Sequence, residues 1–174
     1  MYYKINRKRH QDIYWINMIA LSLGVIMYCI LDKNIEVLSV IVATGISISF
    51  GIRQYKIEND KIFKELFIAF NAKYDSKFNN KLNEIEQKDL ISTEFKLNPE
   101  EQAIIIDYLN LCAEEYLWFE KGRIGEIVWK SWESGMVYYM NIPSINKIIL
   151  LQKNQKDSYY GLFNRIGNRI NNWN

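Results

Sequence analysis

The sequence has few of the residues from which catalytic and metal sites are built. It contains one histidine, His10, and two cysteines, Cys29 and Cys112, among 174 residues. The cysteines form no CxxC pair, so neither a zinc site nor a disulfide framework is expected, and a reducing compartment fits best. A di-metal carboxylate site needs a Glu-x-x-His pair on two helices, which one histidine cannot supply. Without a nucleophile beside a base, or a glycine-rich phosphate loop, we expect no enzyme, no cofactor and no metal.

Turn-forming residues and net charge are also scarce. Two prolines and eight glycines favour a helix-rich chain over a turn-rich sandwich. The net charge is only +2, far from the basic excess of a nucleic-acid-binding domain. Arg165 and Arg169 near the C-terminus are too few to predict phosphate contacts, so a solvated tail is expected there. Direct nucleic-acid binding is therefore doubtful.

Two closely spaced apolar runs near the N-terminus are the strongest feature of the sequence. Residues 13–31 are 19 uncharged residues, close to the roughly 20 that a membrane-spanning helix needs. Residues 37–52 are 16 uncharged residues, a short span that Arg53 can extend by snorkelling. Because only five residues separate the runs, the second must turn straight back. The sequence predicts an all-α fold in which a transmembrane hairpin continues into a cytoplasmic helical bundle.

Two other interpretations of these runs have to be weighed. A signal peptide would explain the basic residues that precede the first run, but this run is longer than a signal core and no cleavage site follows it. Two buried helices of a soluble bundle would also be apolar, but each would be expected to show a polar face, and neither does. We therefore favour the membrane hairpin.

Charge near the ends of the runs predicts their orientation. Lysine and arginine are retained on the cytoplasmic side of a membrane. Residues 1–12 are basic, and Arg53 and Lys56 follow the second run, whereas the connecting loop has one lysine against two acidic residues. Both termini are thus expected in the cytoplasm, with residues 53–174 as the cytoplasmic domain.

Small residues form two rows along the second run. One row is Ser39, Ala43, Ser47 and Gly51, and the other is Gly45 and Ser49. Rows of small residues let helices approach closely in lipid, and these rows could pack on the first helix alone. We expect an oligomer instead, because the hydroxyl groups of both rows and of Thr44 would otherwise face lipid. In a ring they could line a pore, although close packing without a lumen is favoured.

The rest of the chain is predicted to form amphipathic helices. A stripe of apolar residues at three- and four-residue steps over residues 63–85 continues the second run as one long helix, and residues 87–96 look like a linker. Asn98 and Pro99 form the start of a helix that reaches about Glu120, with Gly122 as its stop. Further helices are expected over residues 123–139, from Pro143 and from Ser158.

Two polar pairs lie on or beside the apolar faces of these helices. They are Asn71 with Asp75 and Asn110 with Glu114. A spacing of four puts both members of a pair on one side of a helix, where carboxylates can serve acid–base chemistry or bind a metal. We expect a structural role instead, in hydrogen bonds between helices, with Arg123 or Lys121 as ionic partner.

Aromatic residues make up 14% of the chain and gather in its second half. Some of them must form the core of the bundle. Tyrosine and tryptophan are also enriched in the buried centres of protein interfaces. Trp118, Trp129 and Trp132 are therefore predicted as interface residues.

Three segments carry a resemblance to a known family. They are FNAKYD (70–75), DYLNLCAEEYLWFEKGRI (107–124) and SYYGLF (158–163). With the basic N-terminus and the hairpin, they resemble the small membrane accessory proteins of bacterial type VI-B CRISPR systems. The resemblance implies an inner-membrane ring that forms a pore and supports antiviral defence, with an RNA-targeting effector as functional partner. Some members carry a HEPN-type ribonuclease motif, an arginine followed four to six residues later by a histidine, and His10 has no arginine at that distance.

Three functions follow from these features. The first is an oligomeric inner-membrane pore or permeabilising accessory protein in CRISPR-linked antiviral defence. The second is a membrane-anchored module whose aromatic bundle docks a cytoplasmic partner protein. The third, a HEPN-like ribonuclease, is disfavoured because the sequence lacks the motif.

Overall fold

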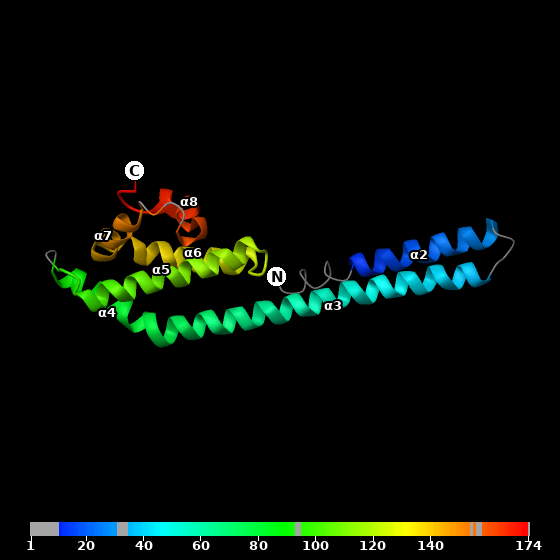
Figure 1. Ribbon diagram of the computed structural model, residues 1–174, viewed down its shortest axis with the longest axis horizontal. Coiled ribbons are helices and arrows are strands. Elements are labelled where there is room, and N and C mark those ends of the chain that lie inside the picture. The colour runs from blue at the N-terminus through cyan, green and yellow to red at the C-terminus, as the bar shows by residue number, and fades with distance from the viewer. Residues whose placement is uncertain (1–10, 31–34, 93–94, 154, 156–157, 174) are drawn as a thin grey trace. The chain divides into compact units, whose positions relative to one another are not determined.

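The computed structural model describes residues 11–30, 35–92, 95–153, 155 and 158–173. Within these ranges every regular element is a helix, so the all-α prediction is confirmed (Figure 1). The chain divides into two units, Met1–Lys61 and Ile62–Asn174, so the boundary lies beyond residue 52, where the second apolar run ends. Residues 1–10 of the predicted basic segment and residues 32–34 of the predicted loop at 32–36 lie outside the described residues, and the last two residues of that loop belong to the helix that begins at Ile35.

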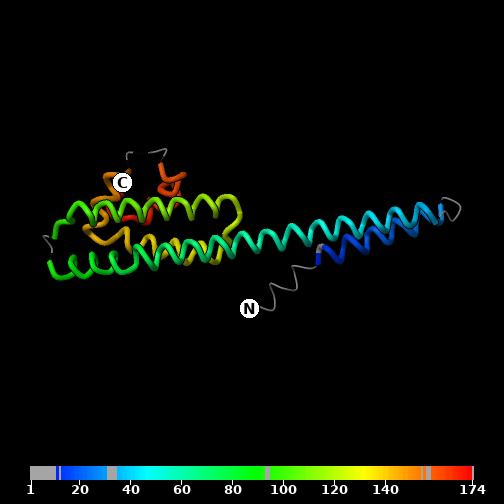
Figure 2. Tube along the Cα trace, turned by 60° about the horizontal axis from the view of Figure 1, so that its bottom comes forward, coloured from blue at the N-terminus to red at the C-terminus, as the bar shows by residue number. Residues whose placement is uncertain are grey.

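The first unit contains α2 (Gln11–Ile30) and the first part of α3 (Ile35–Lys73). Both views show α2 running alongside α3 (Figures 1 and 2), and their contacts pair Asn17 with Ser49 and Gly24 with Leu38, as in an antiparallel arrangement. Each helix has an apolar window long enough to cross a membrane, and only 6% and 11% of these windows are buried. Two helices this exposed are unlike the core helices of a soluble bundle, and they could span a membrane.

The second unit begins with the remainder of α3, which reaches Lys73 as a continuous helix. A π-helical turn, η1 (Tyr74–Phe78), and α4 (Asn79–Ile91) follow without a break. The predicted apolar stripe is largely confirmed, because Phe70, Phe78, Leu82 and Ile85 are all buried. The predicted linker is shorter than residues 87–96, because α4 continues to Ile91 and its last turn is fixed by contacts with the next helix.

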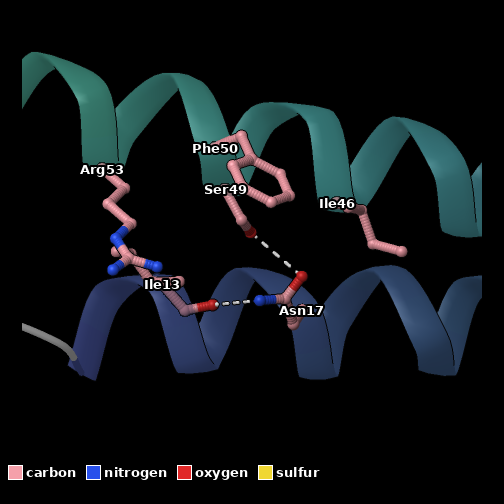
Figure 3. A pocket seen from close by; sticks show the side chains of 6 residues that line it. All are labelled: Ile13, Asn17, Ile46, Ser49, Phe50 and Arg53. Carbon is pink, nitrogen blue, oxygen red and sulfur yellow. Dashed lines mark hydrogen bonds between the residues drawn. The ribbon is translucent and has the colours of Figure 1, made fainter.

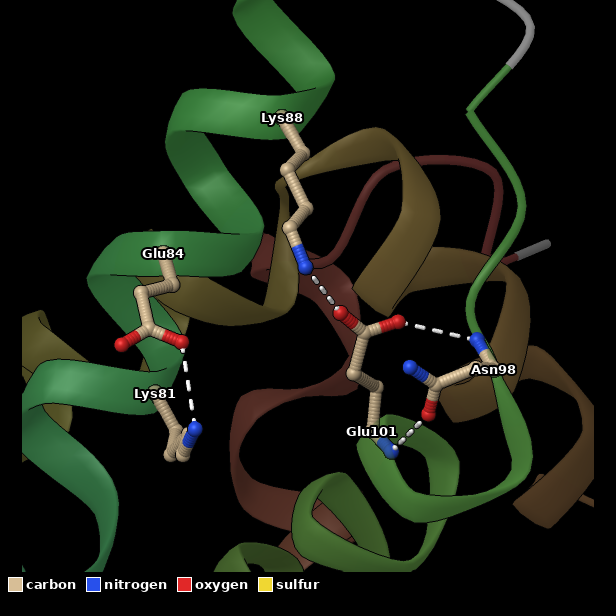
Figure 4. A network of polar contacts seen from close by, with 5 residues as sticks. All are labelled: Lys81, Glu84, Lys88, Asn98 and Glu101. Atoms are coloured by element: carbon tan, nitrogen blue, oxygen red, sulfur yellow. Dashed lines mark hydrogen bonds and ion pairs between the residues drawn. The ribbon is translucent and has the colours of Figure 1, made fainter.

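Those contacts form a polar network at the start of α5 (Pro99–Glu120) (Figure 4). The Asn98 side chain accepts a hydrogen bond from the Glu101 backbone N–H at 2.8 Å, and the Glu101 carboxylate accepts one from the Asn98 backbone N–H at 2.8 Å. This capping box explains why α5 begins where the sequence predicts. Lys88 of α4 donates to the other Glu101 oxygen at 2.6 Å. Burial would raise the pKa of Glu101, but the bonds from Lys88 and Asn98 outweigh it and lower that pKa.

Shorter helices pack around α5 and complete the second unit. They are α6 (Glu126–Met140), α7 (Pro143–Gln152), η2 (Tyr159–Gly161), α8 (Leu162–Ile166) and η3 (Gly167–Arg169). Gly122 has φ +68°, a left-handed conformation that stops α5 as predicted. The start of α7 is fixed from α4, since the Ser144 backbone N–H donates to Asp89 at 2.8 Å. The helices predicted in this region are thus present, with starts shifted by a few residues.

A buried carboxylate holds the C-terminal segment against α6. Glu133 is only 6% exposed, and it accepts a hydrogen bond from Arg169 at 2.7 Å. Arg165 approaches the other Glu133 oxygen to 3.7 Å. The two arginines therefore pair within the protein, and the expectation of a solvated basic tail is wrong.

The capping box gives a direct test of the second unit. Asn98→Ala should lower the free energy of unfolding by about 1 kcal/mol, because it leaves helix N–H groups without an acceptor. Denaturant unfolding of the full-length protein in detergent, followed by far-UV circular dichroism, measures this change. Asn80→Ala, at an exposed position near the start of α4, is the matched control and should cause no loss. Equal destabilisation by both variants would contradict the role of the cap.

Candidate functional site

The α2–α3 pair packs most closely along one of the two rows of small residues. Ser49 donates to the Asn17 side-chain oxygen at 2.9 Å, and the Asn17 amide donates to the Ile13 carbonyl at 3.0 Å (Figure 3). One turn earlier in α3, a Cβ atom added at Gly45 would overlap the Ala20 methyl group. Gly45 and Ser49 therefore serve the packing of the two helices on each other, as one of the predicted alternatives required.

The second row faces away from α2. Ser39, Ala43, Ser47 and Gly51 are all exposed, and a Cβ atom added at Gly51 would meet no atom within 4 Å. We call these four residues the outer ridge. Because two residues correspond to about 200° around an α-helix, the outer ridge lies opposite the row that packs on α2. The row of Gly45 and Ser49 is thus covered by α2, whereas no described residue covers the outer ridge.

The hydroxyl groups of α3 are satisfied within the first unit. Ser39 donates to the Glu36 carbonyl at 2.7 Å. Thr44 and Ser47 each donate to the carbonyl four residues earlier, both at 2.8 Å. Hydrogen bonds of this kind are a common solution for serine and threonine in a helix. These bonds satisfy the hydroxyl donors of Ser39, Thr44 and Ser47 although the side chains stay exposed. The hydroxyl groups alone therefore do not require an oligomer, and assembly has to be argued from the shape of the outer ridge.

The two polar pairs of the second unit are not brought together. The Asn71 amide donates to the Phe67 carbonyl of its own helix at 2.7 Å, and Asp75 is exposed. Glu114 forms an ion pair with Lys73 of α3 at 3.4 Å. Among the described residues, no group of three or more His, Cys, Asp and Glu side chains could hold a metal ion.

Asn110 and Glu114 instead line a polar cavity of about 470 Å³. Ser158, Tyr159 and Tyr160 line it from the C-terminal segment. Both tyrosines have positive φ, 63° and 51°, which is unusual for residues with bulky side chains. The second pair thus faces a hollow in the surface of the second unit, and Glu114 of this pair is joined to α3 by its hydrogen-bonded ion pair with Lys73.

Glu115 is a buried acid that the sequence interpretation missed. It is 7% exposed and lies on the same side of α5 as Tyr108 and Cys112. Burial raises its pKa to about 8, and the neighbouring Glu114 carboxylate adds to this rise, while Lys73 opposes it. A spacing of three from Cys112 and seven from Tyr108 places Glu115 on the buried stripe, so helical periodicity could have found it.

The three predicted interface tryptophans differ in their surroundings. Trp129 is fully buried and stacks on Phe119, with 4.9 Å between ring centroids. Its prediction as an interface residue is wrong, because no part of its ring can be reached from outside. Trp132 is half-buried and stacks on Phe67 with 5.8 Å between centroids. Trp118 is half-buried too, so these two tryptophans belong partly to the core and partly to the surface.

A search against protein families, a search of curated proteins and a search of solved structures each returned no match. The resemblance of three segments to CRISPR accessory proteins therefore stays a prediction. The candidate site is assigned from its own geometry, as the α2–α3 pair with its outer ridge.

The raised pKa of Glu115 predicts a pH dependence of stability. Between its ordinary pKa of 4.5 and its folded-state value of about 8, the folded protein holds a proton that the unfolded chain has released. The free energy of unfolding should therefore fall as pH rises through this range, by at most about 1.4 kcal/mol per pH unit. Thermal unfolding of the detergent-solubilised protein between pH 5 and pH 8 measures the slope.

Glu115→Gln should remove most of this slope, because glutamine is neutral throughout the range. Glu65→Gln, at an exposed position of α3, is the control and should leave the slope unchanged. A Glu115→Gln variant that loses stability with rising pH as steeply as the unmodified protein would show that another group titrates.

Proposed function

We propose that the protein is a homo-oligomer of the bacterial inner membrane that permeabilises this membrane. In this proposal α2 and residues 35–52 of α3 lie in lipid, and copies associate through the outer ridge. The observation that carries the proposal is the separation of the two small-residue rows. One row is used for packing on α2, and the other, on the opposite side of α3, is exposed.

The physical reason is that lipid provides no hydrophobic gain when two apolar helices meet. Helices associate there where small side chains let their backbones approach and gain van der Waals contact. The outer ridge has this property over four successive turns of α3. Large apolar side chains such as Ile48 and Phe50 remain exposed on either side of it, and they suit contact with acyl chains.

A second copy of the same chain is the partner that this surface fits. Every copy has the same outer ridge. Two copies can therefore form a close helix contact with no other partner, because each contributes its own ridge. Association of identical copies favours closed symmetric rings. Because α2 covers the opposite side of α3, it would lie at the outside of such a ring, against lipid.

Permeation is supported by the polar character of the ridge side of α3. Ser39, Thr44 and Ser47 each have a hydroxyl group there, and each hydroxyl oxygen still has a lone pair that can accept a hydrogen bond from water. Pore walls often expose small polar side chains. A ring that opens slightly at the outer ridge would therefore place hydroxyl groups along a water path.

The biological setting is proposed from the sequence. The basic residues that flank both apolar runs support a topology with both termini, and hence the second unit, in the cytoplasm. The segments that resemble type VI-B CRISPR accessory proteins support a role in antiviral defence beside an RNA-targeting effector. The proposal contains no catalytic step.

Ser47→Leu is expected to dissociate the oligomer. Leucine in the middle of the outer ridge would keep two α3 backbones apart, so the mass of the detergent-solubilised protein, measured by light scattering, should fall to that of a monomer. Dye leakage from liposomes that contain the protein should fall to the level of protein-free liposomes.

Ser22→Leu is the matched control for this variant. Ser22 is also an exposed serine in an apolar helix, and its hydroxyl donates to the Met18 carbonyl at 2.8 Å, but it lies on α2. Ser22→Leu should keep both the mass and the leakage of the unmodified protein. If Ser47→Leu also kept them, the hairpin would serve only as an anchor, and the membrane-anchored docking module would replace the pore as the best account.

A further inference from the structure

A small cavity of about 190 Å³ opens between α2 and α3 (Figure 3). It is lined by Ile13, Asn17, Ile46, Ser49, Phe50 and Arg53. Residue 13 begins the first apolar run, and Arg53 directly follows the second. In a membrane, this end of the helix pair would lie at the level of the lipid headgroups.

Arg53 supplies the charge of this cavity. Its side chain extends from α3 across to the first turn of α2, beside Ile13 (Figure 3). Arg53 is exposed, and none of the carboxylates whose side chains the structure describes forms an ion pair with it. A guanidinium group has its donors in a planar fork that matches the oxygens of a phosphate group. Arg53 is thus placed to receive an anion from outside the chain.

The remaining walls separate the cavity into a polar and an apolar part. Asn17 and Ser49 are hydrogen-bonded to each other, and the Asn17 amide also donates to the Ile13 carbonyl, so these two side chains form the polar part of the lining. Ile13, Ile46 and Phe50 give the rest of the lining, and Phe50 is one of the more exposed apolar side chains. Apolar walls next to one cation suit an amphiphile better than a small hydrated ion.

We propose that this cavity binds one anionic phospholipid, with its phosphate on Arg53 and the start of an acyl chain along Ile46 and Phe50. An anionic lipid is favoured over a zwitterionic one because its headgroup has no ammonium group to compete with Arg53 for the phosphate. The proposal rests on the proposed membrane placement of α2 and α3. It does not depend on assembly through the outer ridge, since the outer ridge lies on the other side of α3.

The test measures binding of a defined lipid to the full-length protein in detergent. Dioleoyl-phosphatidylglycerol should raise the unfolding temperature, and dioleoyl-phosphatidylcholine at the same concentration should not. Arg53→Gln should weaken phosphatidylglycerol binding roughly tenfold, as the loss of a charged hydrogen-bonded pair predicts. Arg53→Lys should retain part of the affinity, because the charge remains without the planar fork. Lys61→Gln removes the same charge from an exposed position further along α3 and should have no effect.

Three results would overturn the proposal. The first is equal stabilisation by phosphatidylglycerol and phosphatidylcholine, and the second is equal weakening by Arg53→Gln and Lys61→Gln, which would indicate diffuse charge attraction. The third is equal stabilisation by inorganic phosphate, which would identify a free anion as the ligand.

The outcome can be separated from that of the proposed function. The Ser47→Leu variant should still bind the lipid even where assembly is lost. That result would support lipid binding at the cavity independently of assembly through the outer ridge. A multimeric, permeabilising protein that does not discriminate between the two lipids would contradict the cavity and leave the proposed function standing. Recovery of the protein from cell lysates without detergent, as a soluble monomer, would contradict both.

Discussion

The close approach of α2 and α3 determines what the first unit can do. Gly45 and Ala20 meet with no room for a further methyl group, and Asn17 and Ser49 hydrogen-bond one turn away. This contact fixes the rotation of α3 about its own axis. Once Gly45 faces α2, the outer ridge must face outward, because the two rows are on opposite sides of the helix. The proposed assembly surface and the proposed lipid cavity both follow from this packing of α2 on α3.

Local chemistry made much of the second unit predictable. The start of α5 depends on a side chain, a proline and a glutamate within four residues of one another, Asn98 to Glu101. The stop at Gly122 depends on a conformation that glycine adopts easily. Such signals are complete within a few residues of sequence. The apolar stripe over α3 and α4 was visible for the same reason, since helical periodicity needs no knowledge of the partner.

The features that could not be predicted depend on residues far apart in the chain. Periodicity revealed both small-residue rows of α3 but could not show which row faces α2. The orientation of α3 depends on the contact between Gly45 and Ala20, which are far apart in the sequence. Composition marked Trp129 as a candidate for an interface, whereas its neighbours place it in the core. The partners of Arg165 and Arg169 could not be foreseen because Glu133 lies more than 30 residues earlier in the chain. The candidate site was thus located by sequence and oriented only by structure.

Cross-linking in native membranes tests the central claim most directly. In a Cys29→Ser background, a cysteine introduced by Ala43→Cys on the outer ridge should oxidise to a disulfide-linked dimer, because close helix contact brings the two Cα atoms within the roughly 7 Å that a disulfide can span. Ser22→Cys, exposed on α2, should form no disulfide-linked dimer under the same oxidant. A ridge cysteine that forms no dimer, or a dimer at Ser22→Cys as abundant as at Ala43→Cys, would contradict assembly through the outer ridge.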